Sequence, residues 1–430
     1  MKKASYIASV IATMPACLFA QTVLYNGGTF ITADAGSIIY VDGNINNNST
    51  GAIHNKGDIY LTRDWINDAA SGCLDPTTGT VWLYGNAQTI TGTQSTTFNN
   101  LNCENGGTKT LNIDTYVGGT SGVLQLKSSP FILNTNTLYM TNPSNGGITR
   151  TSGYAVSETD PTSGYGIVQW NLGNSTGNYA YPFGTISGGY IPFLYNITAA
   201  GAPSGTGNIA VATYPTNVTA SPNNRPLPAA IGNLNDASGN ESAVTCADRF
   251  WITNANNFAP VPTANITFSY RDSEWDNSGG STNTIAEDSL KSWRWNGTQW
   301  LNPTKGTDNS SLNTVTVSSV NILSIWTLKG VEPPPPTLCG DFFIPNAFSP
   351  NGDNHNELFK PRNNCIKDIN FKIYNRWGNL VFETTDVTKG WDGSTPRGKE
   401  VNEGVYMYTI KATLNDGALV KKKGTVTLLK

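Results

Sequence analysis

Short apolar alternations that recur at a nearly constant spacing constrain the fold of this chain more than any other feature. Their first members are 22, 20 and 23 residues apart, and the alternations are Ile59/Leu61, Val81/Leu83, Leu101 and Leu124/Leu126. Alternation with period two is typical of half-buried strands, and turns rich in Gly, Asn or Thr follow each one. A recurrence of this length fits one β-solenoid coil per repeat, because each coil buries its face on the next. We therefore predict a β-solenoid-like region over residues 21–143, with an ordinary meander sandwich as the alternative.

The composition favours an extracellular all-β protein. Charged residues make up 13% of the chain and glycine occurs 44 times, whereas about 25% charged residues is usual. No amphipathic helical run is longer than a turn or two. A hydrophobic share of 38% is still enough for packed cores, so the chain is not globally disordered.

The rest of the chain divides into three parts. Residues 144–330 carry strand patterns on both sides of a Pro/Asn/Gly-rich break at 221–240, and these predict one or two β-sandwich domains. Four consecutive prolines, Pro333 to Pro336, predict a stiff extended linker over residues 331–340. Residues 341–430 then form a separate C-terminal domain.

The segment 1–20 has the organisation of a secretory signal peptide. Lys2 and Lys3 precede a short apolar run from Tyr6 to Met14, and Ala20 ends a plausible cleavage site. The run is too short to span a bilayer, and no other segment is expected to do so. A lipoprotein signal on Cys17 is the alternative.

Charge is distributed unevenly along the chain. Residues 341–430 contain 13 basic and 10 acidic residues, a net charge of +3, whereas residues 21–340 contain 12 basic and 20 acidic residues, a net charge of −8. Nucleic-acid-binding proteins need clustered cations against the phosphates, so an acidic body argues against a nucleic-acid partner.

Five cysteines follow the predicted signal peptide, in a compartment that permits disulfides. Cys339 and Cys365 bracket the start of the C-terminal domain and are predicted to pair. Cys73 and Cys103 form the second predicted pair, which leaves Cys246 over.

No G-x-S-x-G, H-E-x-x-H, P-loop or G-x-G-x-x-G motif occurs, and the only histidines are His54 and His355. The acidic stretches 271–276 and 287–288 could offer paired carboxylates for glycoside hydrolysis, but acidic surface loops explain them as well. We therefore expect no catalytic residues, no enzyme activity and no organic cofactor.

Two local clusters could bind ligands. Asn351, Asp353 and Glu357 present oxygens at alternate positions, as in part of a calcium loop, although an Asx-rich turn has the same composition. The indoles of Trp293, Trp295 and Trp300 surround one predicted turn. Exposed aromatic planes can stack on sugar rings, so they are candidate carbohydrate contacts, with burial in a sandwich core as the alternative.

Four sequence blocks near the chain end carry a family resemblance. In order they are Pro345, Asn346, Phe348, Pro350, Asn351, Gly352 and Asp353; then Asn375, Arg376, Trp377 and Gly378; then Trp391, Asp392 and Gly393; and finally Gly404 and Tyr406. Together they resemble the gliding-motility-associated C-terminal domain, the type B sorting domain of the type IX secretion system. Independently of that resemblance, about six short strand patterns with turn signals predict an immunoglobulin-like sandwich.

The resemblance implies export through the periplasm to the cell surface or the medium. It also implies two partners, the type IX translocon and a PorP/SprF-type outer-membrane protein. Residues 79–119 resemble repeats of secreted adhesin-like proteins from the same bacteria, so we expect an adhesin-like or structural role with a surface glycan as a candidate ligand. The alternative is a secreted protein that binds or degrades polysaccharide.

Overall fold

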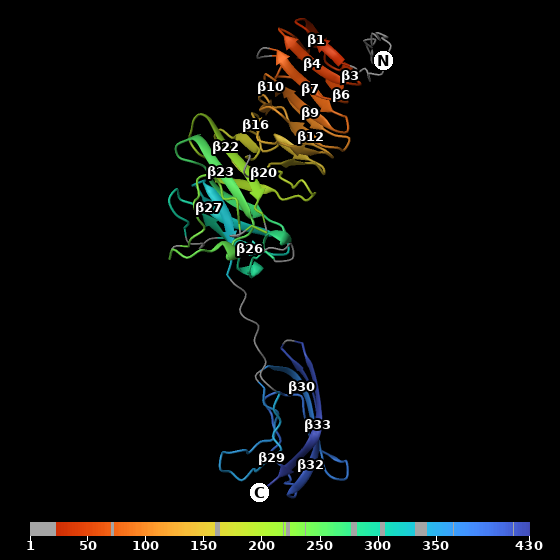
Figure 1. Cartoon of the computed structure of the whole chain (residues 1–430), viewed down its shortest axis with the longest axis vertical. Coiled ribbons are helices and arrows are strands. Elements are labelled where there is room, and N and C mark those ends of the chain that lie inside the picture. Colours follow the sequence, from red (N-terminus) through yellow and green to blue (C-terminus); the bar gives the residue numbers. More distant parts are fainter. Residues whose placement is uncertain are drawn as a thin grey trace. The chain divides into compact units, whose positions relative to one another are not determined.

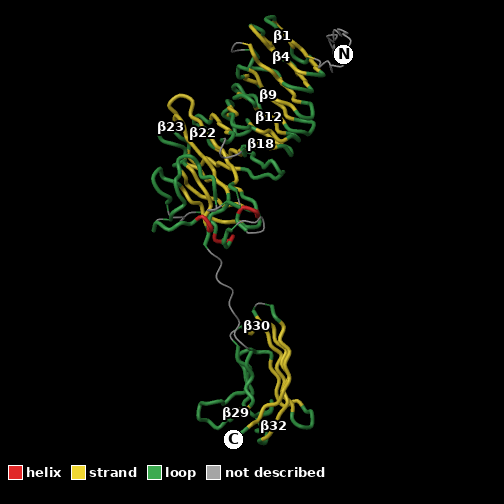
Figure 2. Tube along the Cα trace, viewed as in Figure 1, coloured by secondary structure: helices red, strands yellow, loops and turns green. Residues whose placement is uncertain are grey.

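The computed structural model describes residues 23–430 except 70–72, 160–163, 218, 221–223, 237, 277–281, 302–305, 332–341, 364 and 416. The predicted signal peptide and the proline linker residues 332–340 lie outside this part. The chain divides into two compact units, Met1–Pro333 and Pro334–Lys430. Strands dominate both units, and three short 3-10 helices are the helical elements among the described residues (Figure 2), so the predicted all-β class is confirmed.

The first unit begins with a three-sided parallel β-solenoid, which confirms the predicted coil architecture (Figure 1). Its three sides are the sheets β1-β4-β7-β9-β12-β15-β18 and β3-β6-β8-β11-β14-β17, and a side formed by β2-β5 and then β10-β13-β16-β19. The strands are β1 (Val23–Asn26), β2 (Phe30–Ala33), β3 (Ile38–Val41), β4 (Asn44–Ser49), β5 (Ala52–Asn55), β6 (Asp58–Leu61), β7 (Trp65–Ala69), β8 (Thr80–Leu83), β9 (Gln88–Gly92), β10 (Thr96–Phe98), β11 (Asn100–Cys103), β12 (Lys109–Leu111), β13 (Thr115–Val117), β14 (Leu124–Leu126), β15 (Pro130–Ile132), β16 (Thr137–Met140), β17 (Ile148–Arg150), β18 (Tyr154–Val156) and β19 (Ile167–Asn171).

The apolar alternations found in the sequence lie directly above one another in the solenoid. Ile59, Val81, Leu101 and Leu124 are register partners on successive strands of one side. All four point inward and are buried, so each coil covers the apolar face of its neighbour. This stacking explains the spacing of the alternations, because one recurrence is one circuit of the coil.

Asparagine and glycine occupy the corners between the sides. Asn26 Nδ2 donates to Asn47 Oδ1 of the next coil at 2.8 Å, and Asn47 Nδ2 donates to the Gly51 carbonyl at 2.9 Å. These bonds satisfy polar groups that turn into the interior. At Gly85 a Cβ would lie 1.8 Å from the Thr62 carbonyl oxygen, so only glycine lets these two corners touch.

The solenoid continues into a β-sandwich without a break. β19 pairs parallel with β16 and antiparallel with β22, which extends one solenoid side into the eight-stranded sheet β10-β13-β16-β19-β22-β23-β28-β25. The added strands are β22 (Pro203–Pro215), β23 (Arg249–Phe258), β25 (Lys291–Arg294) and β28 (Ile325–Lys329). The facing sheet β20-β21-β24-β27-β26 contains β20 (Gly177–Tyr181), β21 (Phe193–Ala199), β24 (Thr263–Ser269), β26 (Thr307–Asn309) and β27 (Thr314–Val320).

One hydrophobic core runs from the solenoid into the sandwich. The predicted boundary at residue 143 lies between β16 and β17, within the sixth coil. A second cluster fills the outer face of the extended sheet, where residues 224–246 cover Trp293 and its neighbours.

The C-terminal unit is built on the sheet β29-β33-β32-β30-β31. Its strands are β29 (Ala347–Phe348), β30 (Ile366–Tyr374), β31 (Leu380–Thr384), β32 (Gly404–Leu414) and β33 (Leu419–Leu428). Extended segments joined by isolated bridges, such as Phe359 with Trp391, take the place of the second sheet of the expected sandwich. In neither unit does a described helix have the length and apolarity needed to cross a membrane.

Candidate functional site

An aromatic cluster lies beneath the sorting-motif residues of the C-terminal unit. Phe348, Phe359, Trp391 and Tyr406 are all buried. The ring of Trp391 lies 5.3 Å from Phe348 and 4.8 Å from Tyr406, measured between centroids. Three of the four motif blocks thus each contribute one aromatic side chain, Phe348, Trp391 or Tyr406, to the same core. This shared packing explains why aromatic residues stand at these three distant positions.

The Trp391-Asp392-Gly393 block forms a tight corner. Trp391 Nε1 donates to the Ser394 carbonyl at 2.8 Å, and the Ser394 amide donates to Asp392 Oδ1 at 2.9 Å. Gly393 has a φ of 81°, a left-handed conformation that favours glycine. This block therefore orders the segment that covers the sheet.

The Asn375–Asn379 turn presents its tryptophan to solvent. Asn375 Oδ1 accepts hydrogen bonds from the amides of Trp377 at 3.0 Å and Asn379 at 2.9 Å. Gly378, with a φ of 78°, completes the turn. The turn is held from within, yet Trp377 is 80% exposed, so packing inside this unit does not explain why an indole is placed there.

A hollow of about 740 Å³ lies beside this turn. One wall is Asn375, Arg376 and Trp377, and the other includes the stretch from Lys399 to Tyr406. Two motif blocks that lie far apart in the sequence therefore border one surface. Tryptophan is among the residue types most enriched at the hot spots of protein interfaces, so Trp377 beside this hollow is a candidate partner contact.

The remaining motif residues hold the first segment of the domain in place. The Asn346 carbonyl accepts the Thr427 amide at 2.9 Å, which adds this segment to the edge of β33. Pro350 lies against Gly393, since a Cβ built on that glycine would meet Pro350 Cγ at 3.3 Å. Pro345 precedes β29 and Gly404 begins β32.

The proposed calcium residues instead bond to their own backbone. Asn351 Oδ1 accepts the Asp353 amide at 3.2 Å, and the two Glu357 carboxylate oxygens accept the amides of Gly352 at 3.0 Å and Asn354 at 3.1 Å. This is the geometry of the alternative, an Asx-rich turn. Calcium binding by Asn351, Asp353 and Glu357 stays a prediction.

The predicted Cys73–Cys103 disulfide is wrong, because both are buried free thiols. Cys103 lies on β11 between Leu83 and Leu126, and the side chain of Cys73 packs near Asn67 and Thr96 on another side of the coil. Cys246 is also a buried free thiol. Cys365 is buried and disulfide-bonded, but Cys339 lies outside the described residues, so the Cys339–Cys365 pairing stays a prediction.

The predicted carbohydrate contacts at Trp293, Trp295 and Trp300 are also wrong, since all three indoles are buried. Trp293 and Trp300 stack at 4.7 Å, and Trp300 Nε1 donates to the Asn233 carbonyl at 2.9 Å. The sequence placed the three indoles together correctly. It did not show that the segment around Asn233 folds over them.

The predicted acidic stretch 271–276 takes part in a buried ion network. Arg249 donates to Glu274 Oε1 at 2.7 Å and to Glu158 Oε1 at 2.5 Å, and Arg271 also contacts Glu274. Burial alone would raise the pKa of Glu274, but the charge and hydrogen bonds of Arg249 hold it below its usual value. Glu274 is therefore a structural anion, not a free catalytic carboxylate.

A carboxyl cluster surrounds Tyr270, and of its two hydrogen-bonded acids sequence analysis named Glu287 but not Asp308. Its hydroxyl lies 3.0 Å from Glu287 Oε1 and 3.0 Å from Asp308 Oδ1, although it has only one proton to donate. Burial, opposed by the hydrogen bond from Tyr270, raises the pKa of both carboxyl groups. Only tertiary structure brings Asp308 of β26 to η3 (Glu287–Ser289), so no sequence spacing could reveal the pair.

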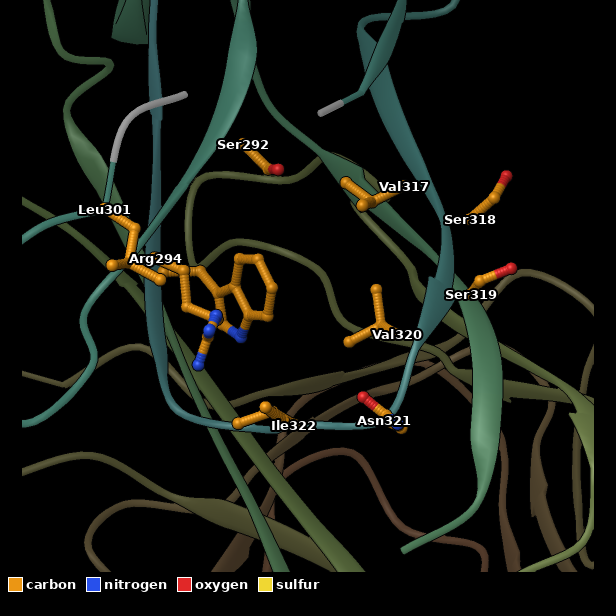
Figure 3. A pocket seen from close by; sticks show the side chains of 10 residues that line it. Ser292, Arg294, Leu301, Val317, Ser318, Ser319, Val320, Asn321 and Ile322 are labelled. Atoms are coloured by element: carbon orange, nitrogen blue, oxygen red, sulfur yellow. The ribbon is translucent and has the colours of Figure 1, made fainter. Parts of the chain in front are cut away.

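Figure 3 shows a second hollow, of about 250 Å³, in the sandwich. Arg294 lies on one side and Val317 and Val320 lie on the other. The Arg294 guanidinium lies 5.7 Å from the Trp326 ring centroid, and burial lowers its pKa. Among the described residues that line it there is no carboxylate, and the Arg294 guanidinium suits it to a small polar or anionic group.

Comparison with known proteins identifies the C-terminal unit. Residues 342–428, about a fifth of the chain, match the family model of the CHU_C type IX secretion signal domain. This domain makes the type IX machinery a partner and implies export to the cell surface or the extracellular medium.

The comparisons say much less about the rest of the chain. No curated protein sequence matches this chain. Among solved structures, the crystal structure of dimeric latent PorU from Porphyromonas gingivalis is 13% identical, with a TM-score of 0.14. The similar part covers 58% of this chain and 25% of that one, so this chain spans about a quarter of that protein's length.

Proposed function

We propose that this protein is an adhesin-like or structural component of the cell surface, delivered there by its C-terminal domain. The observation that carries the proposal is the continuity of the first unit. One eight-stranded sheet and one hydrophobic core join the solenoid to the sandwich. A body of this kind presents extended, fixed faces for contact.

The proposed role is not enzymatic. Asp58 accepts the indole N–H of Trp82, Asp64 accepts the Thr89 amide, and Asp272 accepts the side-chain amide of Asn313. These candidate carboxylates lie on separate elements and are engaged in structural bonds. Hydrolysis of a glycosidic bond needs two carboxyl groups facing each other across the substrate. Glu287 and Asp308 lie near each other, but the Tyr270 hydroxyl lies 3.0 Å from both.

The exposed part of the sorting motif supports a specific partner. A PorP/SprF-type outer-membrane protein would bind the surface around Trp377 and the adjoining hollow, while the buried motif residues keep that surface in shape. A surface glycan is the proposed ligand of the first unit.

The export role is tested by deleting residues 341–430 while keeping the leader, followed by cell fractionation. The truncated chain should accumulate in the periplasm, whereas the full chain reaches the surface or the medium. A second chain that joins residues 334–430 to a periplasmic reporter should carry the reporter outside. Normal export of the truncated chain would refute the proposal.

The surface role is tested with the purified chain on immobilised glycans and on cells. Retained binding without release of reducing ends supports an adhesin. Release of reducing sugar that a Glu287→Gln substitution abolishes would establish the alternative, a polysaccharide-degrading protein.

A further inference from the structure

The first coil of the solenoid has an open edge on all three sides. Among the described residues, β1, β2 and β3 are each hydrogen-bonded to a strand on one side only, at the ends of their sheets. In Figure 1, β1 and β3 lie at the end of the stack of coils, next to β4 and β6. Three free strand edges at one end form a template for further strands.

The interior of this coil is incompletely covered. Leu24, Ile31 and Ile39 point toward the core but are only half-buried. Their register partners one coil further in are Ile45, Ile53 and Ile59, all of which are buried. The end of the solenoid therefore exposes core side chains that another layer would cover.

The outward side chains add apolar surface at the same end. Tyr25, Phe30, Ile38 and Tyr40 are 60%, 75%, 59% and 59% exposed. Monomeric proteins protect free strand edges with lysine, proline, bulges or inward charges. Residues 23–41 contain no lysine and no proline, and Asp34 is their one charged residue.

We infer that this open end binds the open end of a second copy of the same chain. A partner that continues all three sheets must offer a three-sided coil of the same outline. The first coil of a second copy is such a coil. A coil with a single acidic residue can face itself without strong charge repulsion. Cleavage at the predicted site after Ala20 leaves only Gln21 and Thr22 before β1, and two residues are too few to form a covering coil. The inference therefore rests on removal of the leader during the proposed export.

The geometry limits the assembly to a closed pair. At the other end of the solenoid, β19 pairs with β22 and the sandwich continues the sheet. The first coil therefore cannot pair with all three sides of that end, although β17 is the last strand of its sheet there. The contact that continues all three sheets is an end-to-end one related by a two-fold axis. An isologous contact of this kind uses the same surface on both copies and forms a dimer rather than a fibre.

The experiment is sedimentation equilibrium on the chain that begins at Gln21, over a range of concentrations. The expected species is a dimer. Phe30→Lys places a charge on β2 of both copies at the contact and should raise the dimer dissociation constant about tenfold or more. Leu312→Lys is the matched control, because Leu312 is 69% exposed but distant from the solenoid end, and it should leave the dimer intact.

Hydrogen exchange of residues 23–41 gives a second measurement. Amides at the free edges should be protected in the wild-type chain and exchange faster in Phe30→Lys, while circular dichroism shows both variants folded. A wild-type chain that is monomeric at every concentration overturns the inference. So does a dimer that survives Phe30→Lys with unchanged exchange. Neither outcome depends on how the protein is exported, because the purified chain already begins at Gln21.

Discussion

Residues of one type have opposite roles in the C-terminal unit. Trp391 is buried between Phe348 and Tyr406, whereas Trp377 is 80% exposed on a turn that Asn375 holds rigid. The first indole stabilises the fold. The second contributes little to it and is available to a partner.

Replacing each indole by alanine separates these roles. Trp391→Ala should lower the free energy of unfolding by about 3–5 kcal/mol, because a large buried side chain leaves a cavity. Trp377→Ala should change it by less than about 0.5 kcal/mol yet reduce export. Calorimetry of the full chain and cell fractionation measure the two effects. Unchanged export of Trp377→Ala would show that the type IX machinery binds another surface of the domain.

The Tyr270 cluster predicts a pH dependence of stability. The folded-state pKa of Glu287 is raised, chiefly by burial, and Asp308 and Asp272 add to the shift. The folded chain therefore holds this proton more tightly than the unfolded chain, so the contribution to stability is present at low pH. It is lost as the pH rises from the ordinary glutamate value of about 4.3 through the folded pKa.

Glu287→Gln removes this dependence. At pH 7 the variant should be at least as stable as the wild type, and at about pH 4 the two should converge. Urea unfolding at both pH values measures the difference. A variant that is less stable than the wild type only at neutral pH would show that the ionised carboxylate is the favoured form.

At the scale of elements, the Arg249 network joins the solenoid to the sandwich. Glu158 follows β18 of the last coil, Arg249 begins β23, and Glu274 ends η2 (Asp272–Glu274). The Arg249 and Glu274 side chains are almost completely buried. Removal of one partner leaves charge in a medium that solvates it poorly.

Glu158→Gln should therefore destabilise the first unit by about 3 kcal/mol. Glu104→Gln breaks the partly exposed pair with Lys127 and should cost less than about 1 kcal/mol. Equilibrium unfolding in urea compares the two variants with the wild type. Equal costs would mean that the Arg249 network is screened by solvent like the pair on the surface.

At the scale of the whole molecule, thiol chemistry distinguishes the two units. Peptide mapping without reduction should recover Cys339 linked to Cys365, a loop closure worth roughly 3 kcal/mol. Cys73, Cys103 and Cys246 should react with iodoacetamide only after unfolding, since burial raises the pKa of Cys103 to about 12. A free thiol at Cys365 in the secreted protein contradicts the first expectation, and rapid labelling of the native chain contradicts the second.

The sequence by itself determined the features that depend on neighbouring residues. The alternation at Ile59/Leu61 and Val81/Leu83 predicted strands because a strand's inward face repeats every two residues, and its recurrence after 22 residues predicted stacked coils. The Asn375–Asn379 turn and the motif blocks were likewise visible, because turn chemistry acts over a few residues.

Tertiary structure alone decided the features that depend on distant segments. Trp293 is buried because residues 224–246 cross the sheet above it, and Cys103 is a free thiol because its coil places it between two leucines. Tyr270 meets Glu287 and Asp308 only after β24 and β26 are assembled in one sheet. Composition and spacing do not specify such contacts, because the burial of a side chain and its partners depend on which surfaces meet when the whole chain packs.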